Sequence, residues 1–312
     1  MKNTELVSKP SSQLALAKTK NLMAITSKLL SSKNDVAVVD DQWMVRLWEW
    51  ADEHGIHEYQ IPRVLDELMQ LKEFVLVNSQ LITALPKEVG QLTQLTELDI
   101  FKNQLTALPK EIGQLTKLTD FNLGCNQLTE VPKEIGQLTQ LTSLNLSNNQ
   151  LTKVPKEIRQ LTQLTDLGLW GNQLTEVPKE IKQLTQLTSL WLSYNPFTEV
   201  PKEIGQLTQL TKLALARNKL TEVPKEIGQL TQLTELILSE NQLTTLPKEI
   251  GQLTQLTWLW LDRNQLTTLP KEIEQLTQLT TLKLSNNPNL LLSIEQKEWI
   301  SKLVSKRCKV EQ

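Results

Sequence analysis

The chain has 312 residues, of which 39% are apolar and 22% charged, a composition that excludes an intrinsically disordered protein. Its formal net charge of −2 gives no overall positive field to neutralise phosphates, so we expect no nucleic-acid partner. The two cysteines, Cys125 and Cys308, form no metal-binding or redox spacing, which favours a reducing compartment and a cytoplasmic location.

Residues 1–38 are predicted to form a basic, loosely ordered leader. Residues 1–34 contain six lysines and a single glutamate. Leu22, Ile25 and Leu29 have the spacing of a narrow amphipathic stripe, so contact with a membrane surface or a partner is the alternative.

The leader lacks the compact apolar core of a secretory signal. No apolar run in the chain approaches the roughly eighteen residues that span a bilayer, so we expect no transmembrane segment. Export by a specialised route, outside general secretion, remains the alternative to a cytoplasmic location.

Residues 39–67 are predicted to form a helical N-terminal cap. The stretch DDQWMVRLWEWADEHG is typical of a helix that has Asp40 or Asp41 as its N-cap and stops at Gly55. Its apolar side chains lie on two adjoining faces, Trp43, Leu47 and Trp50 on one and Met44, Trp48 and Ala51 on the other. An apolar face this wide is usually buried, so we expect the helix to cover the exposed end of the repeat core. A partner-binding helix is the alternative. Residues 61–65 align with residues 108–112 and indicate a decayed half-repeat.

From residue 68 to residue 290 the sequence repeats with a period of 23. Eight consecutive units between Leu92 and Gln275 follow the pattern LTQLTxLxLxxNQLTxLPKEIxQ. An irregular unit with one inserted residue around Ile82 precedes them, and a unit that decays after Asn287 follows. A fixed period of this length indicates a solenoid, here of about ten stacked units.

Within each unit, apolar residues alternate with variable ones, which is the period of a half-buried strand. In the unit that begins at Leu92, Leu98 and Ile100 alternate with Glu97 and Asp99. No unit can bury its apolar side alone, so the leucines become core only when neighbouring units stack above and below them.

The spacing L-x-x-L-x-L-x-x-N-x-L, held in ten adjacent units, resembles the leucine-rich-repeat family. The LPKEIG variant is similar to the subtype found in bacterial arrays and in intracellular Ras-group scaffolds. The resemblance implies an α/β fold, a curved horseshoe-shaped solenoid. A parallel β-sheet would line its concave side, 3₁₀ or extended turns its convex side, and helices would cap its ends. It also implies a role in protein recognition.

Two positions of the repeat have roles that their chemistry predicts. An asparagine follows each strand, and its amide can satisfy backbone groups where the chain turns. These asparagines are Asn103, Asn126, Asn149, Asn172, Asn195, Asn218, Asn241, Asn264 and Asn287, with Ser79 in the first unit. Further on, a proline precedes Lys-Glu in each unit, and because proline fixes φ and cannot donate, we place this arc on the convex side.

Residues 291–312 are predicted to form a C-terminal capping helix. Ser293 followed three residues later by Gln296 is typical of a capping box. The side chains expected to cover the last repeat are Trp299, Ile300, Leu303 and Val304.

The sequence offers no arrangement for catalysis or for a cofactor. The two histidines, His54 and His57, precede the repeats, so no His-dependent nucleophile or metal cluster can form within the array. Asp52 and Glu58 lie nearby, so a metal site there is the alternative to polar residues at a helix end. The GLWG stretch at 168–171 lacks a phosphate-binding spacing. We predict a non-enzymatic protein with no cofactor and no metal.

The near-identical units can be compared with one another. The threonine before each strand is invariant, and the exposed Lys, Glu, Gln and Thr of the turns hardly vary. The outward positions of the strands and of the turn after them differ from unit to unit, and they hold six of the chain's fourteen aromatic residues. Exposed aromatic and arginine side chains contribute most of the energy of protein interfaces.

We therefore predict a partner-binding set on the concave face. It comprises Phe101, Trp170, Trp191, Tyr194, Lys212, Arg217, Trp258, Trp260, Asp262 and Arg263. The face begins with the acidic residues Glu73, Glu97, Asp99 and Asp120, and its later part carries the basic residues Lys212, Arg217, Arg263 and Lys283. This order predicts a partner of opposite polarity along its length.

Trp170 and Trp191 lie on neighbouring strands, and Trp258 and Trp260 about three strands further on, at about 15 Å. Two anchors so far apart suit an extended protein surface better than a small pocket. The sequence thus predicts a protein–protein interaction module, acting as a bacterial effector or a signalling scaffold. Glycan binding by the concave aromatics is the alternative.

Overall fold

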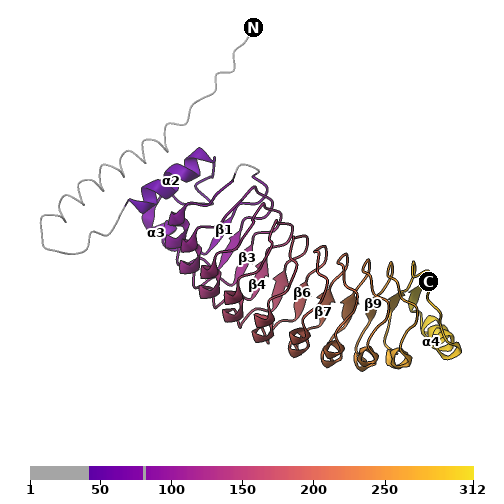
Figure 1. Cartoon of the computed structure of the whole chain (residues 1–312). Helices are drawn as coiled ribbons and strands as arrows, with labels where there is room; N and C mark the ends of the chain where they lie inside the picture. The colour runs from indigo at the N-terminus through magenta and orange to yellow at the C-terminus, as the bar shows by residue number, and fades with distance from the viewer. Residues whose placement is uncertain (1–41, 80–81) are drawn as a thin grey trace, which may run out of the picture. The chain divides into compact units, whose positions relative to one another are not determined.

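The computed structural model of the chain describes residues 42–79 and 82–312 (Figure 1). They fall into two units, Met1–Leu71 and Lys72–Gln312. The predicted leader, residues 1–38, and the two predicted N-cap residues, Asp40 and Asp41, lie outside the described residues.

The first unit contains the predicted helix, α2 (Trp43–Glu53), and a short helix, α3 (Leu65–Leu68). Of the two apolar faces of α2, the one with Met44, Trp48 and Ala51 is buried together with Leu47. Trp43 and Trp50 of the other face are only half-buried. Gln42 occupies the N-cap position without a side-chain capping bond, and the chain turns at Gly55, whose φ is 66°.

Polar contacts tie α2 to the chain that follows it. The Trp48 indole N–H donates to the Pro62 carbonyl at 2.9 Å, and Arg63 pairs with Asp52 at 2.6 Å. The Nδ1 atom of His54 lies 2.8 Å from the Trp50 carbonyl, as expected of a polar residue at a helix end. Among the described residues, no group of three or more His, Cys, Asp or Glu is placed to hold a metal ion.

The second unit is the repeat array, and its described part contains eleven strands of three residues each in one parallel sheet, ordered as in the chain. They are β1 (Glu73–Val75), β2 (Glu97–Asp99), β3 (Asp120–Asn122), β4 (Ser143–Asn145), β5 (Asp166–Gly168), β6 (Ser189–Trp191), β7 (Lys212–Ala214), β8 (Glu235–Ile237), β9 (Trp258–Trp260), β10 (Thr281–Lys283) and β11 (Lys309–Glu311). Each residue pairs with the equivalent residue of the next unit, as Leu98 does with Phe121.

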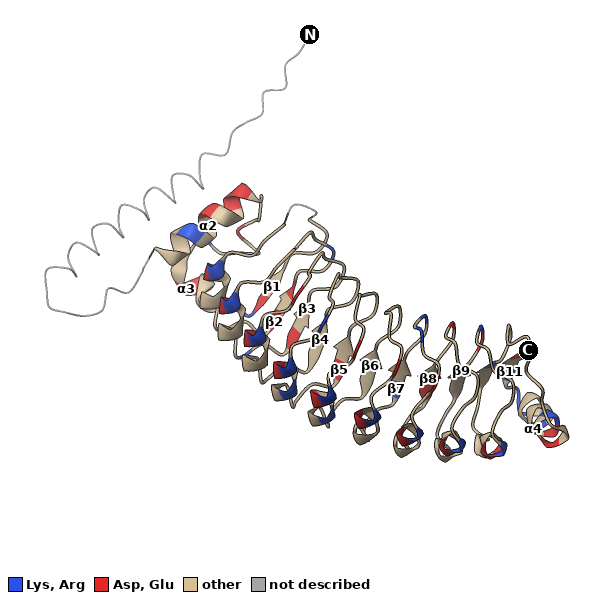
Figure 2. Cartoon of the chain, in the orientation of Figure 1, with Lys and Arg blue, Asp and Glu red and all other residues tan. Residues whose placement is uncertain are grey.

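A five-residue 3₁₀ helix follows each proline that precedes Lys-Glu in the repeat, as the repeat pattern predicts. These helices are η1 (Lys87–Gln91), η2 (Lys110–Gln114), η3 (Lys133–Gln137), η4 (Lys156–Gln160), η5 (Lys179–Gln183), η6 (Lys202–Gln206), η7 (Lys225–Gln229), η8 (Lys248–Gln252) and η9 (Lys271–Gln275). The prolines have φ between −61° and −71°. The predicted Lys and Glu residues lie along these turns (Figure 2).

The core of the array consists of the inward leucines, isoleucines and valines of successive units. In the unit that begins at Leu92, Leu95, Leu98, Ile100 and Ile112 are all buried. Phe121 and Phe197 take the place of leucine at inward positions and are also buried. Each such side chain contributes roughly 1.5–3 kcal/mol to the free energy of unfolding.

The asparagine row joins consecutive units through the backbone. Asn126 donates from Nδ2 to the carbonyls of Leu123 and Ile100, both at 2.9 Å, and its Oδ1 accepts from the Leu105 N–H at 3.0 Å. The same three bonds recur at each asparagine from Asn149 through Asn287. All nine asparagines are buried, so the predicted role of the row is confirmed.

The invariant threonine has a role that the sequence pattern did not reveal. The Thr119 hydroxyl donates to the Thr96 carbonyl at 3.0 Å, and each threonine through Thr280 repeats this bond to the unit before it. The backbone N–H of Thr119 donates to the same carbonyl at 2.8 Å. A second ladder of hydrogen bonds therefore runs along the entrance to the strands.

On the convex side, glycine allows neighbouring turns to pack closely. A Cβ atom at Gly113 would lie 2.8 Å from the carbonyl oxygen of Glu134 in the next turn. Arg159 and Lys182 occupy this position in two consecutive units. The turns η4 and η5, which carry these two side chains, accordingly pack less closely on the turn that follows them than the glycine-bearing turns do.

At the C-terminal end, α4 (Ile294–Ser305) begins with the predicted capping box between Ser293 and Gln296. Trp299, Ile300 and Leu303 are buried, but Val304 is 52% exposed, so its predicted place in the cap is wrong. The helix is also shorter than the predicted segment, because residues 309–311 leave it and pair with β10 as strand β11.

Within the described residues, no helix is both long and apolar enough to cross a lipid bilayer.

Replacement of Asn172 by alanine tests the asparagine row. Its amide donates to the Leu146 and Leu169 carbonyls at 3.1 and 3.0 Å and accepts from Leu151 N–H at 3.0 Å. With three buried backbone groups losing a partner, the free energy of unfolding should fall by about 2–4 kcal/mol in urea titrations. The control is the exposed neighbour Gln173, and Gln173→Ala should lower the free energy of unfolding by less than about 0.5 kcal/mol. Equal losses for the two variants would contradict the proposed role.

Candidate functional site

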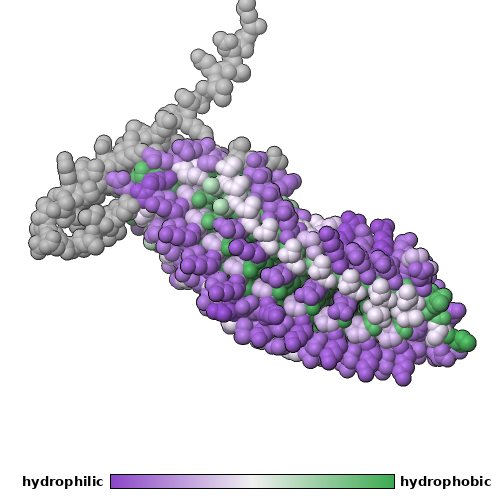
Figure 3. Space-filling model, viewed as in Figure 1, coloured by the Kyte–Doolittle hydropathy of each residue, from purple (hydrophilic) through white to green (hydrophobic). Residues whose placement is uncertain are grey.

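The variable positions predicted from the repeat lie on the exposed face of the sheet and in the turn just after each strand. Parallel register places the first outward residue of every strand in one row, as Glu97, Asp120 and Ser143 show. The second outward residues form a parallel row, to which Trp191 and Trp260 belong. A less hydrophilic strip follows the sheet between two hydrophilic borders (Figure 3).

Four predicted residues and one further residue form a connected group that we call the strand-exit cluster: Trp170, Tyr194, Arg217, Glu240 and Arg263. The Trp170 and Tyr194 rings meet edge to face at 5.1 Å, and the Arg217 guanidinium lies 4.6 Å from the Tyr194 ring centre. Glu240 pairs with Arg217 at 2.8 Å and with Arg263 at 3.6 Å. Its hydrogen bond to Arg217 raises the pKa of that guanidinium above its ordinary value. One carboxylate therefore holds two predicted arginines in place.

In each unit, the residue just before the row asparagine has its backbone in the left-handed region, and we call these residues the left-handed row. The non-glycine members are Asn78, Lys102, Cys125, Asn148, Tyr194, Arg217, Glu240, Arg263 and Asn286, with φ between 53° and 58°, and Gly171 completes the row at 69°. Glycine and asparagine adopt this conformation most readily, and other side chains cost about 1–2 kcal/mol. Lys, Cys, Tyr, Arg and Glu side chains occupy these positions despite that cost, so the conformation belongs to the turn of the repeat and not to one residue type.

The second predicted group, the tryptophan pair, lies on β9. The Trp258 and Trp260 rings are stacked with centres 6.1 Å apart and planes inclined by 11°. The Lys283 ammonium lies 4.0 Å from the Trp260 ring centre and 3.7 Å from the Glu311 carboxylate. Trp258 is 40% exposed, so part of a large aromatic side chain faces solvent.

The remaining predicted residues do not join these two groups. Phe101 lies at the exit of β2, where its ring is within 3.2 Å of the place a Gly124 Cβ would take. Lys212 pairs with Glu235 at 3.2 Å, and Asp262 accepts from the Ser239 hydroxyl at 2.6 Å.

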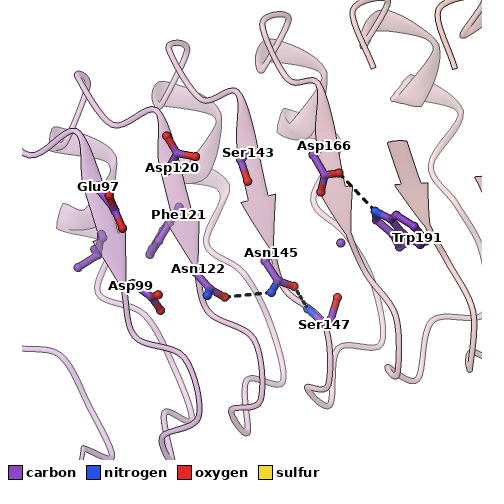
Figure 4. A pocket seen from close by; sticks show the side chains of 12 residues that line it. Glu97, Asp99, Asp120, Phe121, Asn122, Ser143, Asn145, Ser147, Asp166 and Trp191 are labelled. Atoms are coloured by element: carbon purple, nitrogen blue, oxygen red, sulfur yellow. Dashed lines mark hydrogen bonds between the residues drawn. The ribbon is translucent and has the colours of Figure 1, made fainter. Parts of the chain in front are cut away.

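Trp191 belongs to a third feature, an open pocket on β2–β6 that we call the acidic pocket (Figure 4). Its volume is about 460 Å³. The lining residues are Glu97, Leu98, Asp99, Asp120, Phe121, Asn122, Ser143, Asn145, Ser147, Asp166, Gly168 and Trp191. The Trp191 indole N–H donates to the Asp166 carboxylate at 3.3 Å, so the ring is directed toward the neighbouring strand β5.

Sequence reasoning missed most of this pocket. It noted the acidic residues at the start of the face, but it did not connect Asp166, Asn122 and Asn145 with Trp191. The signal was present in the repeat as two rows. The first outward positions of β3, β4 and β5 are Asp120, Ser143 and Asp166, and the second outward positions of β3 to β6 are Asn122, Asn145, Gly168 and Trp191. What the sequence does not reveal is that the indole is directed toward β5 and bonds to Asp166.

The two cysteines are free thiols. Cys308 is buried, and burial raises the pKa of its thiol, the opposite of the change that activates a nucleophile. Cys125 is half-exposed in the left-handed row, where the Asn148 amide lies 3.6 Å from its sulfur.

A family profile for a leucine-rich repeat region matches residues 51–148, 124–218 and 202–303. No curated protein sequence matches the chain significantly. A leucine-rich-repeat protein of Leptospira interrogans is 36% identical over 79% of this chain and 85% of its own, with a TM-score of 0.36. The functional domain of InlJ from Listeria monocytogenes is 29% identical over 73% of this chain and 54% of its own, with a TM-score of 0.54.

A plant structure is also similar. It is the leucine-rich-repeat ectodomain of a membrane receptor kinase from Arabidopsis thaliana, in complex with CASPARIAN STRIP INTEGRITY FACTOR 2. It is 30% identical over 78% of this chain and 32% of its own, with a TM-score of 0.63.

Substitutions at Arg263 test whether the left-handed turn is imposed by the fold. Arg263→Gly should change the free energy of unfolding by less than about 0.5 kcal/mol, because relief of the backbone offsets loss of an exposed ion pair. Arg263→Val should be about 1–2 kcal/mol less stable than the glycine variant, because a β-branched residue fits this conformation poorly. Urea unfolding of both variants provides the measurement. The same midpoint for the two would show that the turn relaxes freely.

Proposed function

Because the chain belongs to the leucine-rich-repeat family, we propose that it is a non-enzymatic module that binds a protein partner on its concave sheet face. The proposed contact set is the strand-exit cluster together with the tryptophan pair and Trp191. Domains of this family are commonly protein-interaction modules, and we assign the chain no catalytic step.

The observation that carries the proposal is where the units differ. Positions on the turns have kept the same Lys, Glu, Gln and Thr, although they are as exposed as the outward strand positions or more so. The sheet face and the strand-exit turns instead carry aromatic and arginine side chains, some at left-handed positions that are costly for them. Partner recognition explains both the location and the type of these residues.

The spacing of the aromatic groups supports an extended partner. Trp191 lies on β6 and the tryptophan pair on β9, three strands along the sheet. At about 4.8 Å per strand they are about 14 Å apart, more than one small ligand fills. The related plant ectodomain was itself solved in complex with another factor, CASPARIAN STRIP INTEGRITY FACTOR 2.

Glycan binding is the second candidate, since stacked tryptophans can hold a sugar ring. The ring faces that a sugar needs are partly taken here, because Lys283 lies over Trp260 and Arg217 over Tyr194. This occupation favours a protein partner. We propose a cytoplasmic scaffold as the setting, with a bacterial effector exported by a specialised route as the alternative.

Affinity capture from lysates of the source cell tests the proposal. The variant Trp258→Ala/Trp260→Ala should capture about tenfold less of the partner protein, or less still. The reason is that aromatic anchors of interfaces contribute about 2 kcal/mol or more to the free energy of binding. Tyr59→Ala is the matched control, since Tyr59 is 80% exposed but lies outside the array, and it should retain the protein. Circular dichroism establishes that all three proteins are folded.

Equal capture by the wild type and the tryptophan variant would remove the sheet face as the binding site. Retention on a glycan array that is lost in the tryptophan variant would instead establish the second candidate.

A further inference from the structure

We propose that the acidic pocket binds a basic, extended polypeptide segment of the partner, with a cationic side chain held between its carboxylates and Trp191. This inference rests on the proposed function and specifies the chemistry of one part of the interface. It replaces the simple polarity expected from the sequence, in which the partner has an acidic end and a basic end.

The first step is the difference in charge pairing between the two parts of the face. All four cations of the later part have carboxylate partners: Lys212 with Glu235, Arg217 and Arg263 with Glu240, and Lys283 with Glu311. In the described part of the chain, no lysine or arginine pairs with Glu97, Asp99, Asp120 or Asp166. The array therefore neutralises its own cationic part and leaves its acidic part for an external cation.

The second step is the shape and lining of the pocket. The pocket is open, has a volume of about 460 Å³ and is lined mostly by polar atoms, which suits a charged segment laid along the sheet. Trp191 forms one wall, and its hydrogen bond to Asp166 fixes the indole beside a carboxylate. A guanidinium can lie against the indole face while it donates to that carboxylate, which combines two favourable interactions.

The third step distinguishes a polypeptide from a metal ion. The carboxylates are distributed over β2, β3 and β5, a span of about 14 Å at 4.8 Å per strand. Within the described residues, no three of them are close enough to share an ion. An extended chain covers that span with about four residues and places every second side chain toward the sheet. Spaced cations on a polypeptide match this arrangement.

A fluorescein-labelled peptide of six Arg-Ser units is the probe, and fluorescence anisotropy with the full chain is the readout. The pocket variant is Glu97→Gln/Asp120→Asn/Asp166→Asn, in which the amide at 166 can still accept from Trp191. The control variant is Glu130→Gln/Glu176→Gln/Glu199→Gln, which removes three carboxylates from exposed turn positions. Both variants therefore carry the same net charge.

The pocket variant should bind the peptide at least about tenfold more weakly than the wild type, while the control variant stays within about twofold. Raising the salt concentration from about 50 mM to about 500 mM should weaken wild-type binding, because the pocket is open to solvent. A peptide with citrulline in place of arginine should bind at least about tenfold more weakly.

Equal loss in the two variants would overturn the proposal, since binding would follow net charge alone. Undetectable binding, or equal binding of the citrulline peptide, would also overturn it. Calcium titration of the wild type and the pocket variant is a further arm. Calcium binding that only the wild type shows would assign the pocket to a cation instead.

The outcome is separable from that of the proposed function. If the pocket variant keeps a partner that the tryptophan variant loses, the sheet face binds a protein but the pocket does not hold its cation. If the peptide binds the pocket but no partner depends on the tryptophan pair, the pocket inference stands and the wider interface fails.

Discussion

The buried asparagine amide at each strand exit is the interaction on which the rest of the array depends. A single unit of 23 residues cannot bury its leucines, so its fold exists only in contact with its neighbours. The amide links its own strand, the preceding strand and the preceding turn through three bonds to backbone groups. It thereby fixes the register between units at the point where the chain leaves the sheet.

That same turn positions the candidate site. The residue just before each asparagine is held in the left-handed conformation, and Tyr194, Arg217, Glu240 and Arg263 project from it in one row. Because the row is set by the backbone, side chains from successive units meet at regular intervals and form contacts such as the Glu240 bridge. Stability and the proposed recognition thus use adjacent positions of the repeat without competing for the same side chain.

The period of the sequence was sufficient to predict the strands, the turns after proline, the asparagine row and the exposed face, because each follows from one repeated pattern. The ends were harder, since they lack a repeat to compare. Val304 is exposed, and residues 309–311 form a strand that no periodicity indicates. Side-chain direction was the other gap. Glu240 and Glu311 pair with predicted cations, and Trp191 bonds to Asp166 of the neighbouring strand, none of which follows from spacing.

The equal step between units gives the array the property of a ruler. Every unit adds one strand, so a gain or loss of one unit between β6 and β9 would move the tryptophan pair by about 4.8 Å relative to Trp191. The inward residues would pair as before, because each unit presents the same ones to its neighbours. Changes in unit number would therefore alter the distance between anchors, and with it the choice of partner, without any redesign of the core.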